Sequence, residues 1–161
     1  MSYNQGLSNS QLMQALSRFP EFLGVFASNQ NPFSKIKKFP CAFIMNTLDS
    51  HEIHGGHWLA FYMPTPKKLE YFDSLGNSLA HYPNIFAYFN NLSQSKIQSS
   101  KPLPSLQSNS SSLCGEFVIT FLTLRLSRPS HSFKSILSLL HNLSPHKREA
   151  FINRLSSILL K

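Results

Sequence analysis

Cysteine is scarce in this chain, and long apolar runs are absent. Two cysteines, Cys41 and Cys114, occur among 161 residues, which excludes a framework of several disulfides and favours free thiols in a reducing compartment. No apolar run approaches the roughly 20 residues that a membrane-spanning helix needs. Residues 1–6 lack the pattern of a signal peptide. We therefore expect a soluble intracellular protein without a membrane partner.

Acidic residues are also scarce. Seven Asp and Glu residues oppose fifteen Lys and Arg residues, so the formal net charge is +8. Such a surface attracts anions such as nucleic acid, acidic protein or anionic lipid, and charge alone does not choose between them. A composition that is 42% hydrophobic excludes a disordered tail. The length suits one domain, residues 1–161, with a real core.

The spacing of apolar residues predicts an α+β protein without internal repeats. Short apolar runs predict strands, the second and third of which lie close enough for an antiparallel hairpin. The strands are expected at 41–47, 57–63, 69–73 and within 96–99. Helical spacing predicts helices at 8–19, 82–92, 113–126, 132–140 and 144–160. The last helix has Phe151, Leu155, Ile158 and Leu159 on one side and Lys147, Arg148 and Arg154 on another.

Cys114 lies where a serine-rich loop meets the apolar segment 113–126. The first turn of a helix has free N–H groups and a partial positive charge, and both stabilise a thiolate. Gly115 is tolerated in that first turn and allows another backbone to come close. A lone cysteine at such a position is more often a small buried hydrophobe. Other residues of the chain favour catalysis.

Those residues are His57, Asp73 and Gln107. A cysteine protease needs an imidazole to pair with the thiolate, a group that orients the imidazole, and donors for the oxyanion. His57 begins one predicted strand and Asp73 ends the next, so a hairpin brings them side by side. Gln107 precedes Cys114 by seven residues, and its amide can join the Cys114 N–H in an oxyanion hole. Each residue alone has an ordinary structural explanation, but their combination points to a thiol protease.

Several motifs resemble those of the adenovirus protease family, adenain, and its relatives in other DNA viruses and virus-like transposons. The resemblance covers about residues 20–125, and the chain after Arg128 matches only in helical character. The order His, Asp, Gln, Cys also occurs in the proteases that process ubiquitin-like proteins, which share the fold. The matching segments are Phe22–Phe26, Cys41–Thr47, Gly55–Phe61, Tyr71–Gly76 and Gln107–Gly115.

The resemblance implies an α+β, papain-like cysteine protease fold with circularly permuted catalytic order. In it, a small mixed sheet packs against a central helix and C-terminal helices. It implies His57, Asp73, Gln107 and Cys114 as catalytic residues, and the substrate would pass Gly56, Trp58 and Gly115. The chemistry would need neither metal nor cofactor. The implied substrates are viral precursor proteins of the capsid or core, cleaved in the virion or in the nucleus or cytoplasm of the host cell by a monomer.

Two features bear on activation and on the acidic residue. In adenovirus a peptide, attached through a cysteine separate from the nucleophile, and DNA activate the enzyme. This chain has no cysteine between Cys41 and Cys114, so we expect any viral peptide to act non-covalently. Stimulation by DNA is compatible with the charge of +8. The acidic member is commonly Glu in adenovirus, whereas relatives use Asp, as at Asp73.

Three other interpretations remain at this level. His51, His54 and His57 are spaced like metal ligands, but Gly55 and Gly56 interrupt the segment and no nearby residue completes a closed zinc set. A second interpretation is a non-catalytic basic virion protein that binds nucleic acid. The third keeps the chemistry and changes the substrate, to give a deubiquitinase or a SUMO-type isopeptidase.

Overall fold

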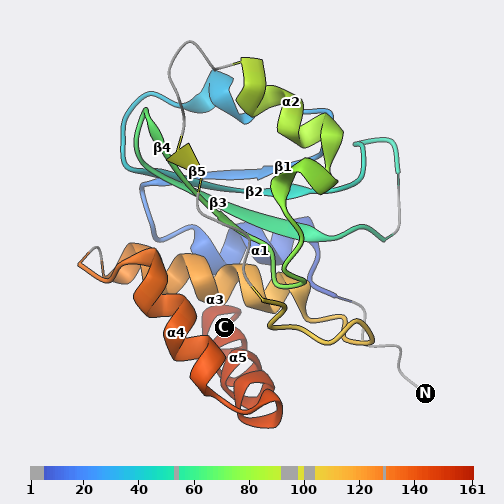
Figure 1. Cartoon of the computed structure of the whole chain (residues 1–161), viewed down its shortest axis with the longest axis vertical. Coiled ribbons are helices and arrows are strands. Elements are labelled where there is room, and N and C mark those ends of the chain that lie inside the picture. Colours follow the sequence, from blue (N-terminus) through green and yellow to red (C-terminus); the bar gives the residue numbers. More distant parts are fainter. Residues whose placement is uncertain (1–5, 53–54, 92–97, 100–103, 129) are drawn as a thin grey trace.

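A five-stranded mixed sheet separates two layers of helices in the computed structural model, which describes residues 6–52, 55–91, 98–99, 104–128 and 130–161 (Figure 1). The strand order is β1-β2-β3-β4-β5, with β2, β3 and β4 antiparallel and each edge strand parallel to its neighbour. The strands are β1 (Phe22–Phe26), β2 (Cys41–Asn46), β3 (Trp58–Thr65), β4 (Lys68–Phe72) and β5 (Gln98–Ser99). The helices are α1 (Asn9–Leu16), α2 (Pro83–Asn91), α3 (Cys114–Ser127), α4 (Phe133–Asn142) and α5 (Pro145–Leu159), with 3-10 turns η1 (Pro32–Lys35) and η2 (Leu79–His81).

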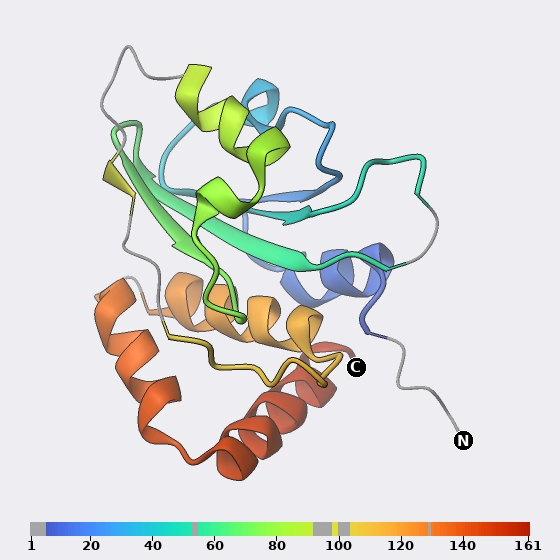
Figure 2. The same cartoon turned by 45° about the vertical axis from the view of Figure 1, so that its right-hand side comes forward.

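Side chains of the central strands are buried on both faces of the sheet. In β2, Phe43 and Met45 point into a core shared with α2, whereas Ala42 and Ile44 point into a core shared with α3. Helix α2 covers the first face, and α1 and α3 cover the second, with α4 and α5 beyond them (Figures 1 and 2). Burial on both faces explains why the predicted strand at 41–47 has a continuous apolar run rather than an alternating one.

Helix α3 is the predicted central helix, and ten of its fourteen residues are buried. A helix that is apolar on all sides is stable only when protein surrounds it. Its ring contacts show this packing, because Phe121 stacks on Phe72 of the sheet with 4.6 Å between ring centroids and meets Phe133 of α4 edge to face. The N-terminal residue of this fixed helix is Cys114.

Two predicted details, the end of α1 and the end of β3, differ from the structure. Helix α1 ends at Leu16 rather than Phe19, before Pro20, which disfavours helical geometry at the residue preceding it. Strand β3 continues through Pro64 to Thr65, because the pairing with β4 is irregular between Tyr62 and Thr65 and that irregularity accommodates a residue without an N–H. The predicted strand within 96–99 is observed at Gln98–Ser99, and residues 96 and 97 lie outside the described residues.

The predicted faces of α5 require a correction. Arg148, expected beside the polar Lys147 and Arg154, is 7% exposed, whereas Ile158, expected on the apolar side, is 57% exposed. Arg148 is buried because its guanidinium donates to backbone carbonyls inside the molecule, at Leu106 and at the end of α4.

Among the helices of the described residues, none has both the length and the apolar character needed to cross a membrane.

Candidate active site

The β3–β4 hairpin brings His57 and Asp73 together across sixteen residues of sequence. His57 immediately precedes β3 and Asp73 immediately follows β4, and the register pairs Ala60 with Phe72. The Nε2–H of His57 donates to Asp73 Oδ1 at 2.6 Å. The predicted hairpin is therefore present, and it places the imidazole and the carboxylate in direct contact.

The carboxylate of Asp73 is buried among hydrogen-bond donors. Besides His57, Oδ1 accepts the N–H of Leu75 at 2.8 Å, and Oδ2 accepts the hydroxyl of Tyr82 at 2.9 Å. Burial by itself raises the pKa of Asp73, but the hydrogen bond and charge of His57, with the Leu75 and Tyr82 donors, outweigh it and lower the pKa below its ordinary value. Asp73 is therefore a carboxylate at neutral pH.

The imidazole of His57 is held as a cation. Burial alone lowers the pKa of His57, but the hydrogen bond and charge of Asp73, together with the nearby Cys114, raise it to about 9. The backbone is fixed as well, because the His57 N–H donates to the Thr47 hydroxyl and the His57 carbonyl accepts the Thr47 N–H, both at 2.9 Å. Because Nε2 is bonded to Asp73, Nδ1 is the ring nitrogen that remains available to the thiol.

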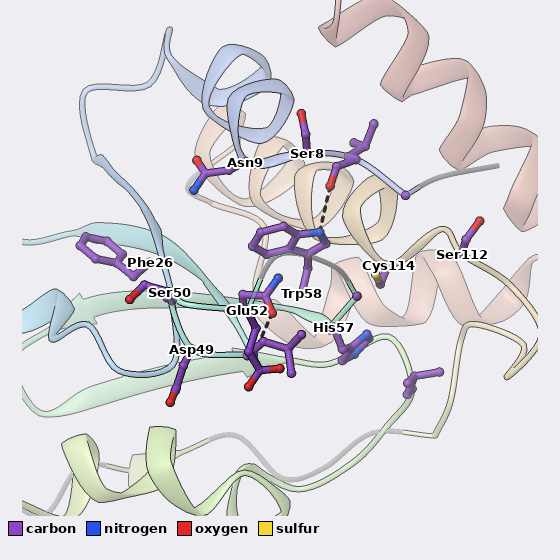
Figure 3. Close-up of a pocket in the computed structure, with 18 of the residues that line it drawn as sticks. Ser8, Asn9, Phe26, Asp49, Ser50, Glu52, His57, Trp58, Ser112 and Cys114 are labelled. Atoms are coloured by element: carbon purple, nitrogen blue, oxygen red, sulfur yellow. Dashed lines mark hydrogen bonds between the residues drawn. The ribbon is translucent and has the colours of Figure 1, made fainter. Parts of the chain in front are cut away.

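Cys114 is the first residue of α3 and opens onto the same cleft as His57 (Figure 3). Backbone N–H groups in the first turn of a helix have no acceptor within the helix, so they are available to an anion. The cleft has a volume of about 930 Å³, and Gln107, Trp58 and Gly56 contribute to its lining. A thiol, an imidazolium and backbone donors thus converge on one open space.

Gln107 also lies in this cleft, and its amide is held at both ends. Its Oε1 accepts the hydroxyl of Ser74 at 2.6 Å, and its Nε2 donates to the carbonyl of Ser111 at 2.7 Å. An amide nitrogen carries two hydrogens, and the Ser111 bond uses one. The other can serve an anion in the cleft.

The three residues expected to border the substrate have tightly fitted surroundings. Gly56 has a φ of +85°, and a Cβ there would collide with the side chain of Asn46. A Cβ on Gly115 would lie 2.8 Å from Leu7 Cβ. The indole N–H of Trp58 donates to the Leu7 carbonyl at 3.0 Å (Figure 3). The segment before α1 therefore rests against both the strand that follows His57 and the helix that begins with Cys114.

Sequence reasoning missed the supporting residues of this site. Leu7, Thr47, Ser74 and Tyr82 contact site residues, yet nothing in their local spacing distinguishes them from ordinary polar or apolar residues. For Ser74 there was one signal, its position directly after Asp73. Among the described residues, no group of three or more His, Cys, Asp or Glu side chains could hold a metal ion, and His54 of the considered histidine set lies outside them.

Two solved structures have a fold similar to that of this chain. The central domain of the Lpg1148 protein from Legionella pneumophila has a similar fold, with a TM-score of 0.60, 12% identity, and coverage of 98% of this chain and 99% of that one. ChlaDub1 from Chlamydia trachomatis matches with a TM-score of 0.51, 17% identity, and coverage of 99% of this chain and 83% of that one. At such identities the likeness concerns the fold alone. No curated protein matches the sequence.

The fold is that of an α+β cysteine protease, as the sequence motifs predicted. The model of the adenovirus endoprotease family matches residues 22–154, which is most of the chain. The chain therefore belongs to the adenovirus endoprotease family and is a cysteine peptidase. The family match extends past Arg128, where sequence motifs alone indicated only helical character.

Proposed function

We propose that this cysteine peptidase is an endopeptidase that uses Cys114 as nucleophile, His57 as acid and base, and Asp73 to orient His57. Gln107 and the N–H of Cys114 form the oxyanion hole. One observation carries the proposal: the imidazole of His57 hydrogen-bonds to the buried Asp73 carboxylate at 2.6 Å, and His57 and Cys114 line the same cleft. This is the arrangement that thiolate–imidazolium catalysis needs.

The reaction follows from these positions. The Cys114 sulfur bonds to the scissile carbonyl carbon, and the carbonyl oxygen becomes an anion that accepts the Cys114 N–H and the Gln107 amide N–H. The His57 imidazolium gives its proton to the leaving amine, the C–N bond breaks, and a thioester remains. Neutral His57 then takes a proton from water, which attacks the thioester and releases the new carboxylate with the thiolate.

The proposed substrates are precursor proteins of a DNA virus, cleaved during maturation of its particles. Membership of the adenovirus endoprotease family supports this choice. An open cleft supports an endopeptidase, because an extended chain can enter and leave it without presenting a terminus.

We also propose that DNA stimulates the enzyme. The chain carries a formal net charge of +8, and of its seven acidic residues Glu70 and Asp73 are buried in ion pairs. A polyanion is attracted to such a protein in a salt-dependent manner. Lys35, Lys37 and Lys38, around the end of η1, offer one basic cluster for this contact.

The test compares the wild type with Cys114→Ala and Cys41→Ala on a mixture of Gly-containing peptides and a ubiquitin-like precursor, with and without DNA. Mass spectrometry identifies the products. We expect peptide cleavage by the wild type and by Cys41→Ala, and none by Cys114→Ala. Cys41 is a matched control because it is buried in β2, where burial raises its pKa to about 11 and leaves it unreactive.

Labelling with a peptide that carries a thiol-reactive electrophile provides a second readout. Cys114 should react much faster than Cys41, and His57→Ala should remove the difference. Full activity of Cys114→Ala would refute the mechanism. Cleavage of the ubiquitin-like precursor alone would keep the mechanism and replace the viral substrates. Equal rates with and without DNA at low salt would remove the proposed stimulation.

A further inference from the structure

Ser74 directly follows Asp73, and its side chain is directed to the other half of the site. The residue is fully buried, at 0% exposure. Its hydroxyl donates to Gln107 Oε1 at 2.6 Å, and its carbonyl accepts the N–H groups of Leu106 and Gln107 at 2.8 and 2.9 Å. Two consecutive residues at the end of β4 thus contact both His57 and Gln107.

The bonds around the Gln107 amide are consistent with only one orientation of that group. Nε2 donates to the Ser111 carbonyl, and Oε1 accepts from Ser74. If the amide flipped, Oε1 would face the Ser111 carbonyl, and two acceptors would meet without a hydrogen between them. The Ser111 carbonyl selects the orientation in which the nitrogen carries its second hydrogen toward an oxyanion, and the Ser74 hydroxyl anchors the opposite end of the amide by donating to Oε1.

The backbone around Gln107 has further anchors that do not depend on the Ser74 hydroxyl. The buried guanidinium of Arg148 donates through Nη1 to the Leu106 carbonyl at 2.8 Å and through Nε to the Leu140 carbonyl at 2.7 Å. The Ser105 hydroxyl donates to the Gln107 carbonyl at 2.7 Å. Removing the Ser74 hydroxyl therefore leaves the Gln107 amide anchored at one end only, through Ser111, while the path of the loop stays the same.

We propose that Ser74 is a positioning residue that orients the Gln107 amide for the oxyanion. This inference rests on the proposed function, in which Gln107 is an oxyanion donor. Asp73 and Ser74 then have complementary roles. Asp73 orients the imidazole that transfers the proton, and Ser74 orients the amide that stabilises the negative oxygen.

The first test measures kcat and KM of Ser74→Ala on a cleaved peptide. An interaction that acts only in the transition state lowers kcat and leaves KM unchanged, and the loss of one hydrogen bond suggests about a tenfold decrease. Alkylation of Cys114 by iodoacetamide needs the thiolate but creates no oxyanion, so its rate should stay at the wild-type value. A parallel loss of alkylation would show general damage to the site and overturn the proposal.

A double-mutant cycle tests whether Ser74 acts through Gln107. Gln107→Ala alone should lower kcat by roughly a hundredfold, as expected for one oxyanion donor. Ser74→Ala should cost nothing further in the Gln107→Ala background. An additive loss in the double variant would overturn the proposal. An unchanged kcat of Gln107→Ala would instead contradict the oxyanion role within the proposed function, so the two failures are distinguishable.

Two control variants separate hydrogen bonding from packing. Ser156→Ala removes a buried hydroxyl of α5 that has no hydrogen-bond partner, and its kcat should equal that of the wild type. Ser74→Thr keeps a hydroxyl donor and should keep the wild-type kcat. A Thr variant as slow as the Ala variant would assign the loss to packing and overturn the proposal, as would a fully active Ser74→Ala.

Discussion

Two buried carboxylates three residues apart, Glu70 in β4 and Asp73 just after it, each pair with a cation, yet their surroundings differ. Glu70 receives two hydrogen bonds from Arg125, at 2.7 and 3.0 Å, and the guanidinium also lies 4.2 Å from the Tyr62 ring centroid. Asp73 receives one hydrogen bond from His57 at 2.6 Å. The side chains of Glu70 and Arg125 are at most 8% exposed, whereas His57 is 14% exposed and lines the cleft.

The two cations differ in what they can do with a proton. A guanidinium stays protonated at any physiological pH. Burial by itself lowers the pKa of Arg125, but the hydrogen bond and charge of Glu70 outweigh burial, so the pKa lies above its ordinary value. An imidazole can give up its proton, and His57 lines the same cleft as Cys114. A buried ion pair therefore indicates catalysis only when its cation can titrate and can reach both a nucleophile and a cleft.

Among variants of the two ion pairs, Asp73→Asn should have the largest effect on catalysis. The neutral amide no longer holds the imidazolium, and we expect kcat/KM to fall by roughly a thousandfold, within the range of general acid–base contributions. The free energy of unfolding should change far less than the activity, because the imidazole of His57 can release its proton once the carboxylate has gone and leaves no unpaired buried charge. Peptide-cleavage kinetics and urea unfolding of the same preparation measure the two effects. Full activity of Asp73→Asn would show that the His57–Asp73 pair is no more catalytic than the Arg125–Glu70 pair.

Glu70→Gln should have the converse outcome. It leaves the buried Arg125 guanidinium without its carboxylate, and loss of one partner of a buried pair costs about 3 kcal/mol of unfolding free energy. The folded fraction should keep its kcat, because Glu70 is not among the residues that line the catalytic cleft. Urea unfolding measures the stability, and active-site titration corrects the rate for the folded fraction. A loss of kcat without a loss of stability would contradict a structural role.

A change of pH should also distinguish the His57–Asp73 pair from the Arg125–Glu70 pair, and it has the smallest expected effect of the three tests. The pKa of His57 is raised to about 9 from 6.5, so the stability from its pairing is complete below about 6.5 and is lost as the pH rises through about 9. The pKa of Asp73 is lowered, so its contribution is lost only as the pH falls below its ordinary range. The guanidinium of Arg125 does not titrate between these limits.

We therefore expect kcat/KM to be flat near neutrality and to fall as the pH rises through about 9. In Asp73→Asn the alkaline decrease should move to lower pH, because burial continues to lower the pKa of His57 while its main stabilising partner has gone. In Glu70→Gln it should not move. An NMR titration of the His57 ring in the three proteins measures the pKa directly, and an unshifted value in Asp73→Asn would contradict the cause assigned here.

The local pattern of apolar residues was sufficient to predict the strands and the helix that hold the catalytic residues. Apolar runs predicted β2, β3 and β4, and helical spacing predicted α3, because these segments are buried and their periodicity follows from burial. The short connection over residues 64–68 was enough to predict the hairpin. That hairpin in turn placed His57 beside Asp73, as the structure confirms.

Contacts between distant segments were beyond the reach of the sequence. Arg148 looked like one more cation on the polar side of a helix, but four carbonyls from Leu106, Leu140, His141 and Leu143 surround its guanidinium. Spacing along a helix records which residues share a face and does not record acceptors on other elements. The same limit hid Leu7, whose carbonyl meets Trp58 across 51 residues.

The sequence by itself determined the chemistry available to this protein. It supplies one cysteine at a helix start, one histidine and one aspartate at the two ends of a hairpin, and a glutamine in the loop before the cysteine. Only the tertiary structure decided which carboxylate faces a guanidinium, which carbonyls surround Arg148, and which serine donates to the amide of Gln107. Those choices depend on distances of about 3 Å between segments far apart in the chain, and only the packing of the whole core sets such distances.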